Sequence, residues 1–306
     1  MKKVGIIILN YNNADTTLRC VESIKSINYS NYLLVIVDNY STDNSYEFLK
    51  KNLEDVDCLL RTDMNGGYAY GNNMGIRYVL ERECEYVLIL NNDVILENDT
   101  LEKLVNYSEK QSGVGVVGPA ILEFNSGDGI IQSTGANNNM FKGTSQLLNH
   151  GRSISALSSD VLYPDYLGGS CLLVSKKVIR EVGLIPEDYF LFYEENEWCL
   201  KIRKNGYKII CDPEAKVYHF GSESINKING LSYYFMIRNV IIFERRNASD
   251  FQFIIFIIYI FIKTISRSLR HPNHWKDFLY YFDGFVGKNR YEYLKDIKNR
   301  ALGMNK

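Results

Sequence analysis

The chain has 306 residues, of which 46% are hydrophobic and 23% charged, with a formal net charge of -1 and an isoelectric point near 6.5. This composition excludes a disordered chain, and the balanced charge excludes a protein that binds nucleic acid through bulk positive charge. Six cysteines without a CxxC pair, and an N-terminus that turns polar too soon for a signal peptide, predict a cytoplasmic protein with reduced thiols.

The N-terminal part alternates short β-branched runs with amphipathic stretches, which is typical of a parallel sheet with helices on both faces. We expect strands at residues 4–9, 32–37, 58–61 and 86–90, and helices at 16–27, 45–52 and 72–83. Polar residues follow three of these strands, at 10–13, 38–43 and 91–93. Since parallel strands point the same way, these polar ends share one edge of the sheet, where ligands bind.

The middle of the chain is less regular. We expect a helix at 100–110, a strand at 114–117 that ends at Gly118-Pro119, and a long, partly mobile insertion between 123 and 160 that is rich in Gly, Ser and Asn. Regular structure should return at 166–174, followed by a helix at 176–182, an acidic helix start near Glu194 and a strand at 208–211. The prediction is one α/β domain over residues 1–240.

Residues 241–306 form a second region of apolar and basic character. The run at 251–262, FQFIIFIIYIFI, contains one polar residue, and its 12 residues are too short to span a bilayer of about 30 Å. Between 263 and 306 there are ten Lys and Arg against four Asp and Glu. An apolar helix beside a basic tail predicts peripheral docking on an anionic membrane surface. The alternative is a buried helix that caps the main domain.

Three polar groups in the N-terminal half carry candidate chemistry. Asp38 ends a strand, and its carboxylate suits the imide N–H of a nucleobase, although an Asx-turn is the simpler explanation. Glycines 66 and 67 let the backbone approach a ligand, and a helix that begins near Asn72 favours a diphosphate at its N-terminus. Asp93, after Asn91 and Asn92, offers an oxygen ligand for Mg²⁺ or Mn²⁺, or forms an ordinary turn.

Further candidates lie in the second half. Glu194, Glu195 and Glu197 fall within four positions, and repulsion between neighbouring acids raises the proton affinity of one of them, which suits a general base. A solvated helix N-terminus would also attract these acids. His219 follows the last predicted strand, where a lone histidine is more often structural than a metal ligand. Trp198 packs either on a sugar face or in the core.

Together these groups resemble the inverting glycosyltransferases of family 2, and the resemblance covers residues 4–239 in the family's order. It implies the GT-A fold, a mostly parallel central sheet with flanking helices, here with a C-terminal helical extension. It also implies transfer of a sugar from a UDP- or dTDP-linked donor to a hydroxyl of a growing cell-surface glycan, as in bacterial rhamnosyltransferases, with Mn²⁺ or Mg²⁺ as cofactor. The acceptor would be a lipid-linked oligosaccharide at the inner face of the cell membrane.

The resemblance also implies roles for individual residues. Glu195, beside Glu194, would be the catalytic base, and Asp93 and His219 would bind the metal. The nucleotide and donor sugar would be bound by Asn10, Tyr11, Asn12, Asp38, Asn65, Gly66, Gly67, Asn72, Asn91 and Asn92. The acceptor would be bound by Gly169, Trp198 and Arg238.

Three positions depart from the family pattern. Asn91 replaces the first Asp of the DxD-type motif, Glu195 replaces the Asp of a Glu-Asp pair, and Pro186 replaces the Asp that usually precedes Glu187. The depleted motif keeps open a second hypothesis, a catalytically silent nucleotide-sugar-binding scaffold of a polysaccharide synthesis complex. The segment LNYNNAD after the first strand lacks both the glycine-rich basic motif of a nucleotidyltransferase and the GxGxxG of a dinucleotide-dependent oxidoreductase.

Overall fold

The computed structural model describes residues 1–53, 56–124, 129–220 and 230–291. The strands of the main sheet are β1 (Val4–Asn10), β2 (Tyr32–Asp38), β3 (Cys58–Arg61), β4 (Tyr86–Asn91), β5 (Val94–Leu96), β6 (Val114–Glu123), β7 (Ile131–Ser133), β10 (Cys171–Ser175) and β11 (Lys208–His219). The helices are α1 (Ala14–Lys25), α2 (Ser45–Asn52), α3 (Tyr68–Glu81), α4 (Thr100–Lys110), α5 (Lys176–Val182), α6 (Glu194–Lys204), α7 (Leu231–Asn247), α8 (Asp250–Arg270) and α9 (Lys276–Val286).

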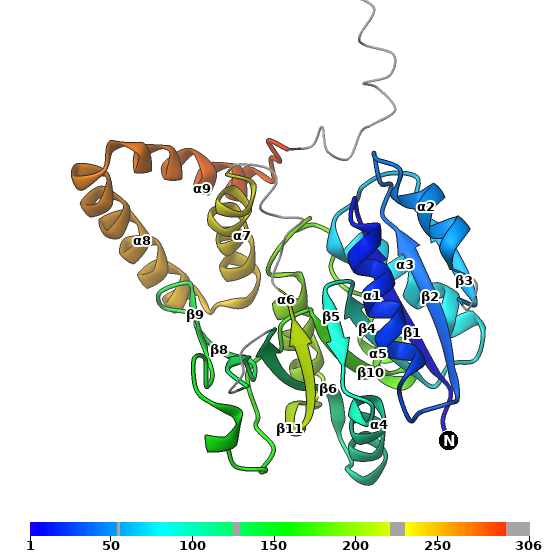
Figure 1. Cartoon of the computed structure of the whole chain (residues 1–306). Coiled ribbons are helices and arrows are strands. Elements are labelled where there is room, and N and C mark those ends of the chain that lie inside the picture. Colours follow the sequence, from blue (N-terminus) through cyan, green and yellow to red (C-terminus); the bar gives the residue numbers. More distant parts are fainter. Residues whose placement is uncertain (54–55, 125–128, 221–229, 292–306) are drawn as a thin grey trace, which may run out of the picture.

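Within the described residues the nine strands form one sheet in the order β3-β2-β1-β4-β10-β6-β11-β5, with β7 paired to β6 (Figure 1). The first four strands in this order are parallel, as the sequence predicts. Alternate residues of β1 enter two different cores: Ile6 and Ile8 pack with α1 and α4, and Ile7 packs with α3, α5 and α6. Burial on both faces explains why these strands are continuously apolar.

The second half of the sheet is mixed, and its strands differ from the predicted ones. β10 begins at Cys171, later than expected, and lies antiparallel between β4 and β6. β6 continues past Gly118-Pro119, and β11 continues to His219 instead of ending at Cys211. Pro119 pairs in register with Asp212, where the register of β11 then shifts, and such an irregularity accommodates a residue without an N–H.

The predicted insertion between 123 and 160 contains strands that its weak side-chain periodicity does not reveal. In its described residues β7 pairs with β6, and β8 (Ala136–Asn139) forms a two-stranded sheet with β9 (Thr144–Leu147). A short 3-10 helix follows at Ile154–Ala156. Backbone pairing supplies the hydrogen bonds here, so the side chains carry little signal.

The C-terminal helices form an open, angular arrangement beside the sheet domain (Figure 1). α7 packs against α9, and residue 240, the boundary that the sequence predicts between the two regions, falls inside α7. A short 3-10 helix, Pro272–Trp275, joins α8 to α9. Residues 292–306, which contain part of the predicted basic excess, lie outside the described residues.

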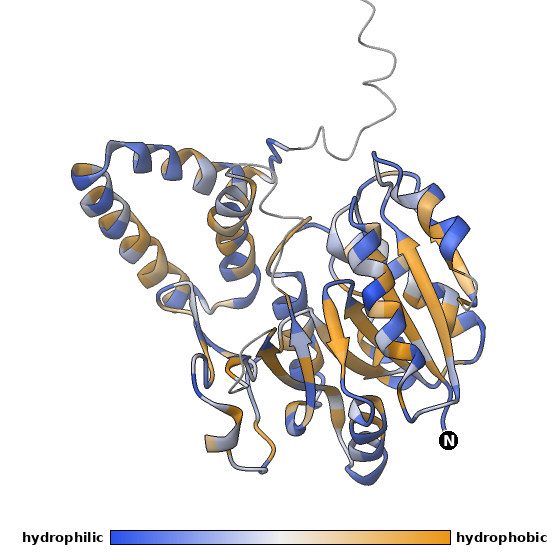
Figure 2. Cartoon of the chain, in the orientation of Figure 1, coloured by the Kyte–Doolittle hydropathy of each residue, from blue (hydrophilic) through white to orange (hydrophobic). Residues whose placement is uncertain are grey.

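Helix α8 is longer than the apolar run that predicts it, and hydrophobic residues occur along much of it (Figure 2). The predicted 12-residue run is too short for a bilayer, but the whole helix has 21 residues and measures about 32 Å, which is long enough to span one. Its length and hydropathy meet the criterion for a membrane span, which core helices of soluble proteins also meet, but only 22% of its apolar window is buried. The alternative of a buried capping helix is therefore not supported.

Candidate active site

The polar ends of β1, β2 and β4 lie at one edge of the sheet, as expected. Asn10 is the register partner of Asp38, and Leu9 is the partner of Asn91. Tyr11 and Asn12 follow β1 directly, half-buried at the same edge. Short-range sequence patterns were sufficient to predict this edge because the three strands are parallel neighbours.

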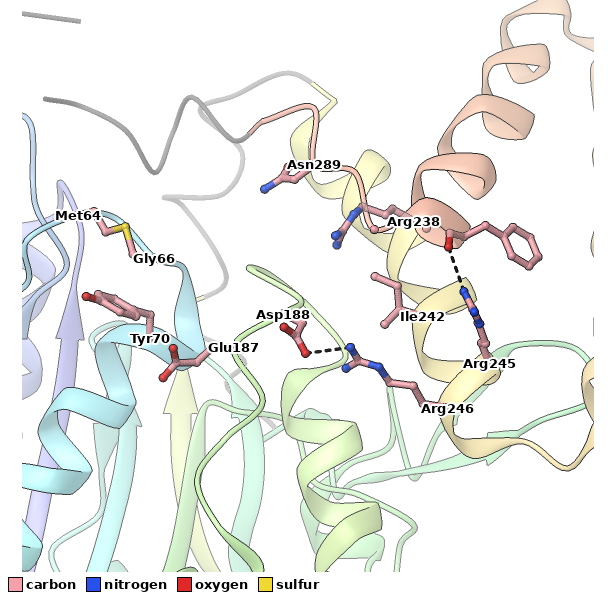
Figure 3. Close-up of a pocket in the computed structure, with 13 residues that line it drawn as sticks. Met64, Gly66, Tyr70, Glu187, Asp188, Arg238, Ile242, Arg245, Arg246 and Asn289 are labelled. Carbon is pink, nitrogen blue, oxygen red and sulfur yellow. Dashed lines mark hydrogen bonds and ion pairs between the residues drawn. The ribbon is translucent and has the colours of Figure 1, made fainter. Parts of the chain in front are cut away.

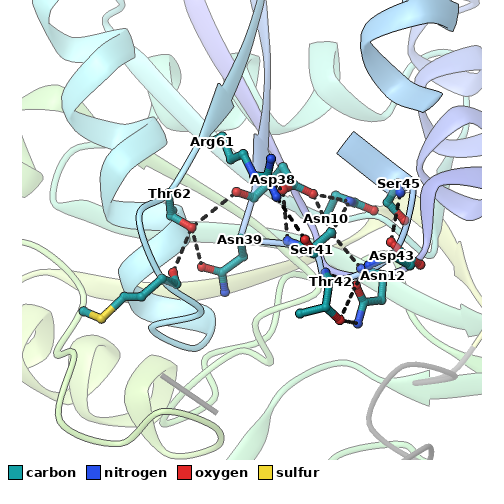
Figure 4. A network of polar contacts seen from close by, with 11 residues as sticks. Asn10, Asn12, Asp38, Asn39, Ser41, Thr42, Asp43, Ser45, Arg61 and Thr62 are labelled. Atoms are coloured by element: carbon teal, nitrogen blue, oxygen red, sulfur yellow. Dashed lines mark hydrogen bonds and ion pairs between the residues drawn. The ribbon is translucent and has the colours of Figure 1, made fainter. Parts of the chain in front are cut away.

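Asp38 is fully buried and lies at the centre of a polar network (Figure 4). Its Oδ1 accepts hydrogen bonds from Asn10 Nδ2 at 2.8 Å and Ser41 Oγ at 2.5 Å. Its Oδ2 accepts from the Ser41 backbone N–H at 3.0 Å and lies 3.4 Å from Arg61 Nε. Three hydrogen bonds and the ion pair with Arg61 thus involve both carboxylate oxygens within the protein. That Asp38 contacts a nucleobase directly stays a prediction.

Asp38 organises the residues around it. Arg61, the last residue of β3, donates to the Ser41 carbonyl at 3.1 Å and lies over the rings of Tyr46 and Tyr40 at 4.6 and 5.2 Å. Asn12 also joins this loop to the sheet edge, because its Oδ1 accepts from the Thr42 N–H at 2.8 Å. We did not single out Arg61 or Tyr40 from the sequence, although Arg61 ends a predicted strand at the same edge.

The glycine loop is tied to the loop that contains Phe190. Gly67 has φ +85°, and a Cβ there would lie 2.0 Å from the Phe190 carbonyl oxygen, which accepts from the Tyr68 N–H at 3.0 Å. Asn65 Oδ1 accepts from the Gly67 N–H at 3.1 Å, and Gly66 packs on Tyr70. Only glycine permits this approach of two backbones.

Helix α3 begins at Tyr68, four residues earlier than predicted, so Asn72 is not at its N-terminus. Asn72 is buried, and its Nδ2 donates to the Tyr68 carbonyl at 3.0 Å. The earlier start follows from Gly67, which adopts the positive φ that ends the loop. The prediction that Asn72 opens a diphosphate-binding helix is therefore wrong.

Asp93 and His219 lie together, as the resemblance implies. Antiparallel pairing of β5 with β11 makes His219 the register partner of Val94, and His219 Nε2 lies 3.1 Å from Asp93 Oδ1. His219 Nδ1 lies 2.7 Å from Gln132 Oε1, an acceptor atom that favours a proton on Nδ1. The Nε2 lone pair then faces a carboxylate oxygen.

This pair fits a divalent cation, because a cation between a nitrogen lone pair and a carboxylate oxygen satisfies both acceptors. Among the described residues no cluster of three or more His, Cys, Asp or Glu side chains could hold a metal. Other oxygens would have to complete the coordination. Asn92 ties this turn to α1, because its Nδ2 donates to Thr17 Oγ1 at 3.0 Å.

A cavity of about 320 Å³ brings the candidate catalytic residues together. Asn91 and His219 lie in its wall from the sheet edge, and Glu194 and Glu195 from the N-terminus of α6. Gly169 and Tyr68 also line it, and the Tyr68 hydroxyl donates to the Gly169 carbonyl at 2.6 Å. Burial and the neighbouring carboxylates of Glu195 and Glu194 raise the pKa of Tyr68, which keeps this donor protonated.

The two adjacent acids have different environments. Glu195 is half-buried in the cavity wall, and burial raises the pKa of its carboxyl to about 7 against the lowering effect of two backbone N–H groups. Glu194 is only 3% exposed, and its pKa is raised well above the usual range, mainly by burial and to a smaller extent by repulsion from the Glu195 carboxylate. Its Oε2 has no hydrogen-bond partner within the described chain. Glu195 is therefore the better placed general base.

The turn before these acids has an unusual backbone. Phe190, Phe192 and Tyr193 have φ of 70°, 67° and 77°, a region that bulky residues rarely adopt. Asn239 of α7 holds the turn, since its Nδ2 lies 3.1, 2.7 and 3.0 Å from the carbonyl oxygens of Tyr189, Leu191 and Phe192. Arg238 Nη1 in turn donates to Asn239 Oδ1 at 2.6 Å.

Two predicted acceptor residues lie outside the Glu195 cavity. Trp198 has no exposed surface, and its indole N–H donates to the Gly183 carbonyl at 3.0 Å, so it is a core residue that cannot pack on a sugar. Arg238 lines a different cavity between α3 and α7. Glu197 is also structural, because it is buried against Tyr189 and pairs with Lys201 at 2.8 Å. Of the three predicted acceptor residues, Gly169 lies in the wall of the Glu195 cavity.

Comparison with known proteins agrees with this architecture. Residues 5–162, about half of the chain, match the model of glycosyl transferase family 2. The dTDP-rhamnosyl transferase RfbF of Shigella flexneri is 26% identical over 79% of this chain and 79% of its own length. The low-salt glycan biosynthesis hexosyltransferase Agl10 of Haloferax volcanii is 28% identical over 67% of this chain, which spans 63% of Agl10.

The fold is also shared with a solved structure. The mannosyltransferase PcManGT of Pyrobaculum calidifontis, in complex with GDP-Man and Mn²⁺, superposes with a TM-score of 0.56 at 16% identity, over 99% of this chain and 81% of that one. The mixed sheet with its covering helices is the GT-A fold of such enzymes. With the family match over half its length, the chain belongs to glycosyl transferase family 2.

Proposed function

We propose that this protein transfers a hexosyl or rhamnosyl group from a nucleoside diphosphate sugar to a hydroxyl of a growing glycan, with Glu195 as the general base. One observation carries this proposal: Glu195, with a pKa of about 7, lines the same cavity as Asn91 and His219 at the carboxyl edge of the sheet. A carboxylate near this pKa accepts a proton efficiently at neutral pH.

In the proposed reaction the acceptor hydroxyl gives its proton to a Glu195 carboxylate oxygen. The hydroxyl oxygen forms a bond to the anomeric carbon while the bond from that carbon to the diphosphate breaks, with inversion at the carbon. The nucleoside diphosphate leaves with the electron pair of the broken bond. Tyr68 and Gly169 shape the wall beside the base, and their hydrogen bond keeps this wall in place.

Asp93 and His219 would hold a divalent cation, Mn²⁺ or Mg²⁺, together with oxygens of the diphosphate. When bound, such an ion would stabilise negative charge on the leaving diphosphate. The support is the 3.1 Å approach of His219 Nε2 to Asp93 Oδ1 and the presence of Mn²⁺ in the PcManGT complex. Asn91 lines the same cavity at the position where the family's motif has its first Asp, so it would contact the donor as a neutral side chain.

The donor is proposed to be UDP- or dTDP-linked. The names of Agl10 and RfbF support a hexose or rhamnose, and no side chain of the described cavity decides between the two bases. The nucleotide would lie over the Asp38 network, where Arg61, Tyr40 and the half-buried Tyr11 are the groups available to it. Asp38 would also hold Asn10 and Ser41 in place.

We further propose a lipid-linked oligosaccharide acceptor and docking at the inner face of the cell membrane. Much of the α8 and α9 surface is apolar and exposed: Phe251, Ile254, Ile258, Phe261, Ile262, Leu279 and Phe282 are each 47–67% exposed. Lys263, Arg267 and Arg270 follow on α8 and would meet anionic lipid headgroups. The helices on either side of α8 in the chain, α7 and α9, pack against each other. Both ends of α8 therefore stay on the same side of the membrane, and α8 would lie in the interface and not cross the bilayer.

The proposed function is tested by nucleotide release from a panel of UDP-, dTDP- and GDP-sugars, with and without Mn²⁺. We expect release from a UDP- or dTDP-sugar that depends on Mn²⁺ and is lost in Glu195→Gln. Tight nucleotide binding without release from any donor, with or without lipid extract as acceptor source, would instead support the silent scaffold.

Membrane docking is tested with the full chain and vesicles that contain phosphatidylglycerol. The double variant Ile258→Ser/Phe261→Ser replaces exposed side chains and should reduce cosedimentation with the vesicles, while Phe48→Ser, at an exposed position on α2, should not. Equal binding of both variants would contradict docking through α8.

A further inference from the structure

A second cavity, of about 670 Å³, lies outside the Glu195 cavity, between the start of α3 and helices α7 and α9 (Figure 3). Gly66 and Tyr70 line its α3 side. Arg238, Arg245 and Arg246 line the α7 side. Three guanidinium groups around one cavity favour an anionic ligand with several oxygens, such as a phosphate or diphosphate.

Arg238 differs from the other two arginines in its burial and in its hydrogen-bond partners. It is only 4% exposed, and its hydrogen bonds go to neutral oxygens, from Nε to the Lys288 carbonyl at 2.7 Å and from Nη1 to Asn239 Oδ1 at 2.6 Å. Within the described residues it has no direct ion pair. Burial lowers the pKa of Arg238, although Asp283 and Asp188 act on it from a distance. A bound anion would offset the cost of burying this charge.

The carboxylates of the same cavity are already paired. Asp188 Oδ2 lies 2.9 Å from Arg246 Nη2. Glu187 accepts from Asn73 Nδ2 at 2.7 Å and lies 3.7 Å from Arg77. Arg245 Nη1 donates only to the Phe285 carbonyl, at 3.0 Å, and its side chain is exposed. The positive charge left for a ligand is therefore that of Arg238 and Arg245.

An apolar groove adjoins this cavity. It has a volume of about 230 Å³ and lies between α8 and α9, where isoleucine and aromatic side chains such as Phe261, Phe278 and Phe282 line it. Phe285 lines both the groove and the arginine cavity. A cationic cavity and an apolar groove that share Phe285 in their walls are together complementary to an amphiphile with an anionic head and a hydrocarbon chain.

We propose that Arg238 and Arg245 bind the phosphate head of the acceptor lipid and that the groove between α8 and α9 binds the first part of its hydrocarbon chain. This inference rests on the proposed function, which supplies a lipid-linked acceptor. Arg238 precedes Asn239, the residue that holds the turn leading to Glu194 and Glu195. A head bound at Arg238 would thus lie next to Asn239, which holds the turn before the catalytic acids.

A single lipid head fits this cavity better than a bilayer surface does. The exposed Lys263 and Arg270 of α8 can reach headgroups in a membrane plane, but Arg238 is almost completely buried. Only a head that leaves the plane and enters the cavity would reach its guanidinium. The occupant we infer is therefore one phosphate-headed isoprenoid molecule and not the bilayer as a whole.

The test uses farnesyl diphosphate as the probe, with the full chain in EDTA so that the nucleotide site holds no metal. Trp275, which is 50% exposed and stacks on Phe278 with 5.8 Å between ring centroids, reports binding by fluorescence, because Trp198 is fully buried. Farnesyl diphosphate should bind at least tenfold more tightly than farnesol or inorganic diphosphate. Equal affinity for farnesol would overturn the anionic part of the proposal.

Three variants locate the site. Arg245→Gln should weaken farnesyl diphosphate binding about tenfold without changing farnesol binding, and Arg245→Lys should recover part of it. Phe282→Ser should weaken both ligands. Arg180→Gln, an exposed arginine on α5, is the matched control and should bind like the unmodified protein. Indistinguishable behaviour of Arg245→Gln and Arg180→Gln would contradict the assignment.

Two further measurements separate the remaining explanations. If Arg245→Gln lost binding to phosphatidylglycerol vesicles but kept its affinity for farnesyl diphosphate, the arginines would serve the bilayer and the proposal would be wrong. Binding of UDP or dTDP to the unmodified protein is measured in parallel with Mn²⁺. Nucleotide binding without farnesyl diphosphate binding contradicts only this inference, and the reverse result contradicts the proposed transferase function.

Discussion

The side-chain nitrogen of Asn239 lies 2.7 Å from the backbone carbonyl oxygen of Leu191, three residues before the first acid of the Glu194-Glu195 pair. The residues on either side of Leu191 have positive φ, so this contact holds a backbone that bulky side chains disfavour. Helix α7, far along the chain, thereby positions the start of α6.

Asn239→Ala should release this turn. We expect the free energy of unfolding to fall by about 1–3 kcal/mol, because buried carbonyls lose their donor, and kcat to fall more than the donor affinity does. Urea unfolding and steady-state kinetics measure the two effects. Asn247→Ala is the matched control, since Asn247 lies on the same helix and its Nδ2 bonds only the Phe243 carbonyl. Equal kcat in the two variants would contradict a positioning role.

Glu195→Gln should lower kcat by about 10³-fold, because the amide cannot accept the acceptor proton, while nucleotide binding stays within twofold. Glu194→Gln should have a much smaller effect, since Glu194 is 3% exposed and burial, which raises its pKa, disfavours the carboxylate form that would accept a proton. The exposed Glu47→Gln serves as the control. A larger loss in Glu194→Gln than in Glu195→Gln would reverse the assignment of the base.

The pH dependence of kcat/KM should follow the Glu195 carboxyl. Burial raises its pKa to about 7, so the carboxylate form that accepts a proton is depleted below this pH. We expect kcat/KM to rise about tenfold per pH unit below 7 and to level off above it. A profile already flat at pH 5 would mean that a group with an ordinary carboxyl pKa is the base.

Removal of either Asp93 or His219 should weaken metal activation. Asp93→Asn and His219→Ala are each expected to raise the Mn²⁺ concentration for half-maximal activity more than tenfold, because each removes one of the two proposed protein ligands. Mn²⁺ titration of nucleotide release measures this. His271→Ala, an exposed histidine after α8, is the control. Unchanged Mn²⁺ dependence in both site variants would exclude this pair as the metal site.

Glu244 should make stability depend on pH. It is 2% exposed, its Oε2 lacks a partner among the described residues, and burial raises its pKa to about 8. Because the folded pKa lies above the unfolded value, the favourable contribution is full below about pH 4.5 and is lost as pH rises to 8. Between pH 5 and 8 the free energy of unfolding should therefore fall by at least about 2 kcal/mol more in the unmodified protein than in Glu244→Gln. Urea unfolding at the two pH values measures this difference, and an equal fall in both proteins would contradict the prediction.

Several features could be predicted from the sequence because they depend on local patterns. The apolar runs of β1, β2 and β4 and the polar residues after them predict three parallel strands whose polar ends share one edge, and the structure confirms this arrangement. Ligand binding at this edge stays a prediction. The acids at 194 and 195 occur at the start of a helix as expected. The predicted ends of β6 and β11 were wrong because a bulge and long-range pairing, which leave no local trace, extend them.

Local sequence patterns place Asp38, Asp93, Glu195 and His219 at the ends of regular elements. Which of these polar groups meet depends on the three-dimensional packing of the chain. Long-range strand pairing placed His219 beside Asp93, 126 positions away in the sequence. Packing buried Glu194 almost completely and left Glu195 half-buried in the cavity wall. Packing also buried Asp38 and Trp198 and moved Arg238 into a second cavity. Such contacts depend on how distant segments pack in three dimensions, and no short sequence pattern encodes them.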